Sequence, residues 1–136
     1  MTKTKGIVLV VEGNHAIRIL MSSIIESSGF ECISVSDSRT AISILRDRPD
    51  VQVVFTDIAM PGEMDGIDLA HLVRSQWPSI SLVVASGKSS LEKLDLPKDV
   101  PFFRKPYDSN AVLTVIGDMV SANREIITLA SLPALH

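Results

Sequence analysis

Five short hydrophobic runs alternate along the chain with segments whose hydrophobic positions recur every three or four residues. The runs are rich in β-branched residues, which is typical of strands. They cover residues 6–11, 31–35, 51–57, 81–86 and 100–105. The first, third and fourth runs are hydrophobic almost throughout, as strands must be when both faces of their sheet are covered.

The segments between the runs are predicted to be helices. Helical spacing of hydrophobic residues is clear within 17–25, 41–45, 67–77 and 112–119, and weak in the short polar stretch 88–99. Gly29 provides a stop for the first helix, and Asp37 or Ser38 can cap the second. Pro49 and Pro78 end the second and third helices, because the residue before a proline disfavours helical backbone.

Strands that alternate with helices predict a doubly wound α/β fold, in which a five-stranded parallel sheet carries helices on both faces. The 136 residues, of which 46% are hydrophobic, suffice for one domain with a substantial core. Because no repeat or linker interrupts the pattern, we expect one domain over residues 1–122. Residues 123–136 would form a tail that either extends the last helix or is disordered.

Charge and composition exclude several classes of partner. The net charge is −3 and the pI is near 5.5, so the chain has no basic field to attract nucleic acid or an anionic membrane. No hydrophobic stretch approaches the roughly 18 residues of a membrane helix. A single cysteine cannot form an internal disulfide, which favours a reducing cytoplasm.

Chemically competent side chains stand at the ends of four predicted strands. Glu12 follows the first strand, Asp57 ends the third, Ser86 ends the fourth and Lys105 ends the fifth. The carboxyl ends of parallel strands meet at one edge of a sheet, where ligands collect. We therefore expect two acids, a hydroxyl and an amine to converge at that edge.

The stretches that carry these residues read VLVVEGN (8–14), FTDIAMPGEMDG (55–66), VVASG (83–87) and FFRKPY (102–107). In order and spacing they resemble a response-regulator receiver domain of two-component signalling, over about residues 6 to 122. The resemblance implies a flavodoxin-like fold of five strand–helix units with the strand order 2-1-3-4-5.

The resemblance also implies roles for the strand-end residues. Asp57 would be the phosphoacceptor, which attacks a phosphohistidine to form an acyl phosphate. Lys105 would offset the negative charge of the carboxylate and later pair with a phosphoryl oxygen. Ser86 would hydrogen-bond the phosphoryl group and act as a switch, together with Phe102 in the position of the family's switching aromatic.

A magnesium site is also implied by the resemblance, with Glu12, Asp57 and the backbone carbonyl of Ala59 as ligands. The family usually has two adjacent acids after the first strand, and here Gly13 replaces the second, which normally contacts the metal. Since Mg²⁺ requires hard oxygen ligands, we expect at most weak binding. The stretch PGEMDG (61–66) also has one residue more than the family's commoner form.

Enzyme motifs are incomplete in this sequence. A phosphatase that forms an aspartyl phosphate would need an aspartate where Ala59 stands. Gly87, Lys88 and Ser89 imitate the end of a phosphate-binding loop, but Leu82 stands where its first glycine is required. We therefore expect a signalling domain and not an enzyme.

Two functions follow from the resemblance. The first is a phosphorelay receiver that takes a phosphoryl group from a histidine kinase or phosphotransfer protein onto Asp57. It would signal to a downstream protein through the face of its fourth helix, fifth strand and fifth helix, and two copies could pair through the same face. The alternative is a pseudo-receiver that binds proteins without phosphorylation, because the acidic pair formed by Glu12 and Gly13 is incomplete.

Overall fold

The computed structural model describes residues 5–87 and 95–131, with side chains described to residue 122. Five parallel strands form one sheet in the order β2-β1-β3-β4-β5, which confirms the predicted fold class and strand order. The strands are β1 (Ile7–Val11), β2 (Glu31–Val35), β3 (Val53–Asp57), β4 (Ser81–Ser86) and β5 (Phe102–Arg104).

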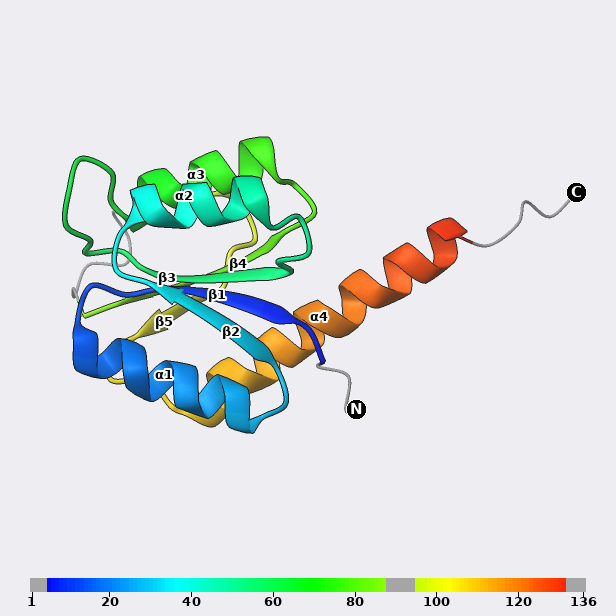
Figure 1. Ribbon diagram of the computed structural model, residues 1–136, viewed down its shortest axis with the longest axis horizontal. Coiled ribbons are helices and arrows are strands. Elements are labelled where there is room, and N and C mark those ends of the chain that lie inside the picture. Colours follow the sequence, from blue (N-terminus) through cyan, green and yellow to red (C-terminus); the bar gives the residue numbers. More distant parts are fainter. Residues whose placement is uncertain (1–4, 88–94, 132–136) are drawn as a thin grey trace, which may run out of the picture.

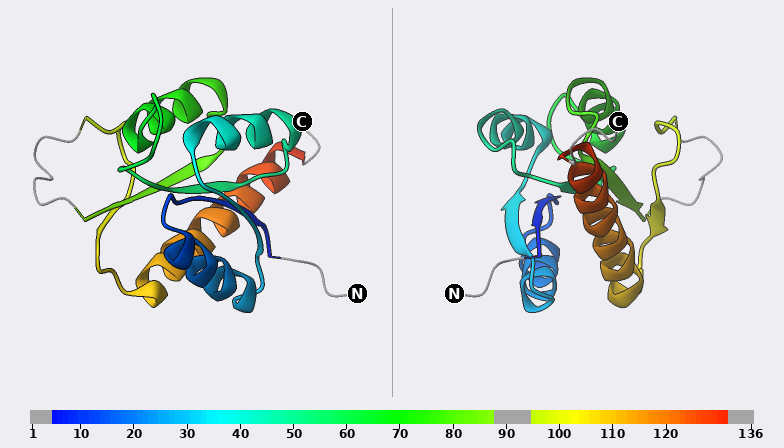
Figure 2. Two further views of the ribbon diagram at one scale, coloured as in Figure 1. Left: turned by 60° about the vertical axis from the view of Figure 1, so that its left-hand side comes forward. Right: turned by 90° about the vertical axis from the view of Figure 1, so that its right-hand side faces the viewer.

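Helices cover both faces of the sheet. They are α1 (His15–Ser27), α2 (Ser38–Asp47), α3 (Gly66–Gln76) and α4 (Ser109–Ser131). Figure 1 shows α2 and α3 on one face, and α1 with the first half of α4 on the other. The turned views of Figure 2 show the same separation into three layers. In the described residues, no helix has both the length and the hydropathy needed to cross a membrane.

Side-chain caps determine where the first three helices begin. Asn14 accepts a hydrogen bond from the Ile17 amide, and Asp37 accepts one from the Thr40 amide. Asp65 forms a capping box with Asp68 at the start of α3. Each such cap satisfies an amide that the helix leaves unpaired, and contributes about 1 kcal/mol.

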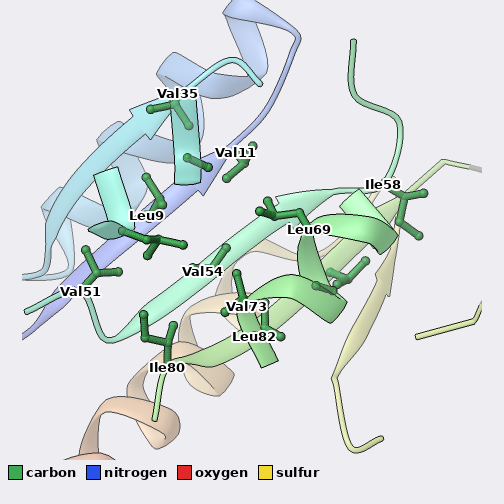
Figure 3. Close-up of a cluster of buried hydrophobic side chains, with 14 residues drawn as sticks. Leu9, Val11, Val35, Val51, Val54, Ile58, Leu69, Val73, Ile80 and Leu82 are labelled. Atoms are coloured by element: carbon green, nitrogen blue, oxygen red, sulfur yellow. The ribbon is translucent and has the colours of Figure 1, made fainter. Parts of the chain in front are cut away.

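The two hydrophobic clusters follow from the alternation of side chains along each strand. In β1, Leu9 and Val11 face α2 and α3, whereas Val8 and Val10 face α1 and α4, and all four are fully buried. Figure 3 shows the cluster on the α2–α3 side, where Leu69 of α3 packs over the central strands. The continuous hydrophobic runs are thus explained, because β1, β3 and β4 are covered on both faces.

Several predicted element boundaries differ from the structure. The third and fifth strands are shorter than the predicted 51–57 and 100–105, although Val51 is only 2% exposed. A residue can therefore fill the core without belonging to a strand ladder. In the predicted helix 88–99, residues 88–94 lie outside the described part of the chain, and residues 95–99 are not helical.

The last helix is longer than its hydrophobic pattern suggests. Helix α4 has 23 residues, so it crosses the predicted domain end at residue 122 and continues to Ser131. Val112, Ile116 and Val120 are buried against the sheet. Beyond these residues α4 continues past the ends of the strands, on the side where β1 begins (Figure 1).

Candidate functional site

The parallel register brings the predicted strand-end residues to one edge of the sheet. Glu12 follows β1, Asp57 ends β3, Ser86 ends β4 and Lys105 follows β5. The Lys105 amide donates to the Ser86 carbonyl at 2.9 Å, which joins the tips of β4 and β5. This pairing places the backbone of Lys105 at the same edge of the sheet as the two acids.

The centre of the site is an ion-paired group of three side chains. The Lys105 ammonium lies 2.7 Å from Glu12 Oε1 and 2.9 Å from Asp57 Oδ2. Side-chain exposure is 8% for Glu12, 11% for Asp57 and 21% for Lys105. The acids are therefore largely removed from water, and the more accessible amine compensates one of their two negative charges.

Backbone amides hold the other oxygen of each acid. The Asn14 amide donates to Glu12 Oε2 at 3.1 Å, and the Ala59 amide donates to Asp57 Oδ1 at 3.3 Å. Arg18 donates from its guanidinium to the Glu12 carbonyl at 2.8 Å, which anchors the backbone at the end of β1. All four carboxylate oxygens of Glu12 and Asp57 are engaged.

The lysine keeps its charge in this setting. Burial acts to lower the pKa of Lys105, but hydrogen bonds and charge interactions with Glu12 and Asp57 outweigh it and raise the pKa above its usual value. The site therefore contains a permanent cation at neutral pH.

The two residues predicted to act as a switch lie on β4 and β5. Ser86 is 1% exposed at the tip of β4. Phe102 is partly buried and packs on the α2–α3 side of the sheet, whereas Phe103 packs on the opposite side. Strand alternation thus separates two adjacent aromatics, and Phe102 is the one that borders the α2–α3 cluster.

The donor set does not fit a magnesium ion well. Gly13 contributes no side chain, and both Glu12 and Asp57 are bonded to Lys105. In the parts of the chain that the structure describes, no group of three or more histidine, cysteine, aspartate or glutamate side chains could hold a metal. Mg²⁺ needs a near-octahedral set of oxygens, which these residues do not supply.

Sequence reasoning missed two residues that shape the site. Gly66 starts α3, and a Cβ built there would collide with the Asp57 carbonyl oxygen. Tyr107 packs edge-to-face on Phe55, with ring centroids 5.8 Å apart, and on Phe103. Burial raises the pKa of Tyr107. The Asp-Gly pair before α3 and the tyrosine after Lys-Pro were the available signals.

The longer loop after β3 forms one wall of a surface hollow of about 850 Å³. The opposite wall is α2, with Ile42 among its lining residues, and the loop contributes Pro61, Gly62, Glu63 and Met64. The hollow is distinct from the ion-paired group, since Glu12, Asp57 and Lys105 do not line it. Gly62 has a φ of 97°, a conformation that suits glycine.

Sequence comparisons show that the chain is similar to several known proteins. Sporulation initiation phosphotransferase F of Bacillus subtilis is 25% identical over 109 residues, which cover 77% of this chain and 86% of that protein. The DNA-binding transcriptional regulator NtrC of Proteus hauseri is 26% identical over 89% of this chain, but the match covers 26% of NtrC. A putative NtrX-like response regulator of Rickettsia bellii is 30% identical over 62% of this chain and 18% of that protein. This chain thus spans about a quarter or less of the NtrC and NtrX-like relatives.

A solved structure shows the same fold. The response regulator receiver domain protein from Clostridium thermocellum superposes with a TM-score of 0.81, at 20% identity, over 89% of this chain and 98% of that one. The family model for the response regulator receiver domain matches residues 8–116, which include all four strand-end residues. The chain therefore belongs to the response regulator receiver domain family of two-component systems.

Proposed function

We propose that this receiver domain accepts a phosphoryl group on Asp57 from a phosphohistidine of a kinase or phosphotransfer protein. The observation that carries the proposal is the 2.9 Å contact between Lys105 Nζ and Asp57 Oδ2 at the carboxyl edge of the sheet. This contact holds a cation on an acid that is otherwise well shielded from water.

The chemistry needs that cation. An Asp57 oxygen would attack phosphorus, an O–P bond would form, and the N–P bond to the donor imidazole would break with its electron pair on nitrogen. A carboxylate and a phosphoryl group repel each other, so a positive charge beside the attacking oxygen lowers the barrier. Lys105 would then pair with a phosphoryl oxygen in place of the carboxylate oxygen that the new bond occupies.

The phosphorylated state would be read through a protein-binding face. In this proposal Ser86 donates a hydrogen bond to the phosphoryl group, and Phe102 of β5 changes its packing against the cluster on the α2–α3 side of the sheet. A switch of this kind biases two existing conformations, with coupling free energies of typically about 1–3 kcal/mol. The downstream partner would be a protein, and two copies of the chain could pair through the same face.

The direct test is phosphorylation by purified kinase or by a small phosphodonor. We expect a mass gain of one phosphoryl group, which is lost on treatment with hydroxylamine, the reagent that cleaves acyl phosphates. Peptide mapping after borohydride reduction should locate the modification at Asp57. Absence of any modification with several donors would contradict the proposal.

A phosphorylation-independent pseudo-receiver is the second candidate. Gly13 favours it, because the usual second acid is missing. If the protein is a pseudo-receiver, the wild type and Asp57→Asn should bind the protein partner with equal affinity. Neither should gain the mass of a phosphoryl group. The same experiments therefore separate the two functions. A cytoplasmic location and the absence of enzymatic turnover stay predictions under both.

A further inference from the structure

We propose that the acceptor pocket works without a divalent cation, because Glu12 holds the Lys105 ammonium against Asp57 as the resident positive charge. In this arrangement Glu12 is a positioning residue and not a metal ligand. This proposal concerns the same site as the proposed phosphoacceptor function. Only its phosphorylation experiment depends on that function.

The first support is the geometry of the bridge. Lys105 Nζ contacts Glu12 Oε1 at 2.7 Å, a shorter distance than its 2.9 Å contact with Asp57 Oδ2. Glutamate is one methylene longer than aspartate, and this length lets a residue at the end of β1 reach an amine that follows β5. Only 8% of the Glu12 side chain is exposed, so this contact is shielded from competition by water.

The second support is that the side-chain oxygens at the end of β1 already accept hydrogen bonds. Glu12 Oε2 accepts from the Asn14 amide, and Asn14 Oδ1 accepts from the Ile17 amide at 3.0 Å as the cap of α1. A metal ion that bound Glu12 in place of the ammonium, or the Asn14 side chain in place of the Ile17 amide, would exchange an existing contact for a new one. Both exchanges cost free energy that binding would have to supply.

The third support is the charge of the pocket. Glu12, Asp57 and Lys105 together carry a single net negative charge, whereas an acid at position 13 would add a second one. This remaining charge belongs to the two carboxylates, which share one ammonium. The pocket thus has less need of a second cation than a pocket with two adjacent acids.

The position of Gly13 allows the missing acid to be restored. A Cβ there would lie 3.3 Å from Pro61 Cδ and 3.8 Å from the Ser36 carbonyl oxygen. These contacts require a shift of a few tenths of an ångström at most. Gly13→Asp therefore adds a carboxylate beside the pocket without a backbone collision.

The first experiment is calorimetric titration of MgCl₂ into the wild type and Gly13→Asp, with Glu26→Asp as a conservative surface control. We expect Gly13→Asp to bind Mg²⁺ at least about tenfold more tightly than the wild type, and the control to match the wild type. Wild-type binding as tight as that of Gly13→Asp would overturn the proposal.

The second experiment observes the lysine directly. In ¹⁵N-detected NMR, the Lys105 Nζ signal of the wild type should be protected from exchange and unchanged by MgCl₂. It should broaden in Glu12→Gln, which keeps the length of the side chain but removes its charge. Glu26→Gln is the matched control. A Lys105 signal that is insensitive to Glu12→Gln would show that Glu12 does not position the amine.

The third experiment separates this inference from the proposed function. The rate of phosphorylation by phosphoramidate is compared in EDTA and in MgCl₂. We expect equal rates for the wild type, a Mg²⁺-stimulated rate for Gly13→Asp, and a rate lower by about tenfold for Glu12→Gln in both buffers. A wild type that is phosphorylated only with Mg²⁺ would refute the inference and leave the proposed function intact. A wild type phosphorylated in neither buffer would refute the proposed function, while calorimetry and NMR still decide whether Glu12 positions Lys105.

Discussion

Lys105 Nζ lies closer to Glu12 Oε1, at 2.7 Å, than to the proposed phosphoacceptor Asp57, whose Oδ2 is 2.9 Å away. Glu12 and Lys105 are 93 positions apart in the sequence. The pair connects the ends of β1 and β5, which are not neighbours in the sheet. The Lys105 ammonium thus pairs with both acids. We therefore expect the reactivity of Asp57 to depend on the contact between Lys105 and Glu12.

Replacement of the acceptor should abolish phosphorylation without loss of the fold. Asp57→Asn keeps the size of the side chain and removes the nucleophilic charge, so intact-mass spectrometry should show no phosphoryl gain from any donor. The matched control is Asp118→Asn, the same change at an exposed position of α4. Phosphoryl gain by Asp57→Asn at the wild-type rate would place the acceptor elsewhere.

Removal of the amine should slow phosphorylation and lower stability. Lys105→Ala leaves Glu12 and Asp57 largely buried without their cation, so we expect the free energy of unfolding to fall by about 1–3 kcal/mol. A domain of this size has about 5–15 kcal/mol in total, so it should remain folded. Urea denaturation followed by circular dichroism measures the loss.

A second substitution tests the cause of that loss. Adding Glu12→Gln to Lys105→Ala removes one of the two uncompensated charges, and should recover part of the lost free energy of unfolding. If the double variant is as unstable as the sum of the two single variants, Lys105 stabilises the fold by packing and not by charge compensation.

The close approach of α3 to the acceptor should make Gly66 sensitive to any side chain. A Cβ at Gly66 would meet the backbone of Asp57 and Ile58, which cannot move aside easily, so Gly66→Ala should destabilise the fold by about 1–3 kcal/mol. Gly117→Ala in α4 is the control, because a Cβ there meets no atom within 4 Å. That control should gain about 0.5–1 kcal/mol from helix propensity. Equal effects at both glycines in thermal unfolding would contradict the role of Gly66.

The single cysteine should react slowly in the folded protein. Burial raises the pKa of Cys32, the hydrogen bond with Ser22 lowers it, and the charge of Glu26 raises it further, with a net increase. Only the thiolate is nucleophilic, so alkylation by iodoacetamide at pH 8 should be much slower in the native than in the urea-unfolded chain. Its rate should keep rising with pH above the usual thiol pKa.

Two variants test whether the pKa of Cys32 controls its alkylation rate. Ser22→Ala removes the interaction that favours the thiolate and should slow alkylation, whereas Glu26→Gln removes a repelling charge and should speed it. Both should leave the reaction of the unfolded protein unchanged. The opposite order of rates would show that access, and not the pKa of Cys32, controls the reaction.

The fold could be predicted because burial on both faces leaves a strong signal in sequence. Continuous hydrophobic runs identified β1, β3 and β4, and proline and capping residues marked most helix boundaries. The ends of strands were less accurate. Val51 and Val53 look alike in sequence, and only the backbone pairing with β1 decides that the ladder begins at Val53.

The convergence of Glu12, Asp57, Ser86 and Lys105 could also be predicted, because the carboxyl ends of parallel strands lie at one edge of the sheet. From the sequence alone, Asp57 and Lys105 were expected to pair, and the loss of an acid at Gly13 was evident. That Glu12 would turn its charge toward Lys105 could not be read from the sequence. Side-chain reach across the sheet depends on strand register and on which amides occupy the remaining oxygens.

The sequence by itself determined the strand order, the two-sided core and the residue types at the strand ends, since each follows from local periodicity or from short motifs that resemble the family. Only the tertiary structure determined that the Lys105 ammonium pairs with both Glu12 and Asp57, and that a side chain at Gly66 would collide with the backbone of Asp57. Both depend on contacts between segments far apart in the chain. Such contacts are fixed by packing and hydrogen bonding in three dimensions, and no local pattern encodes them.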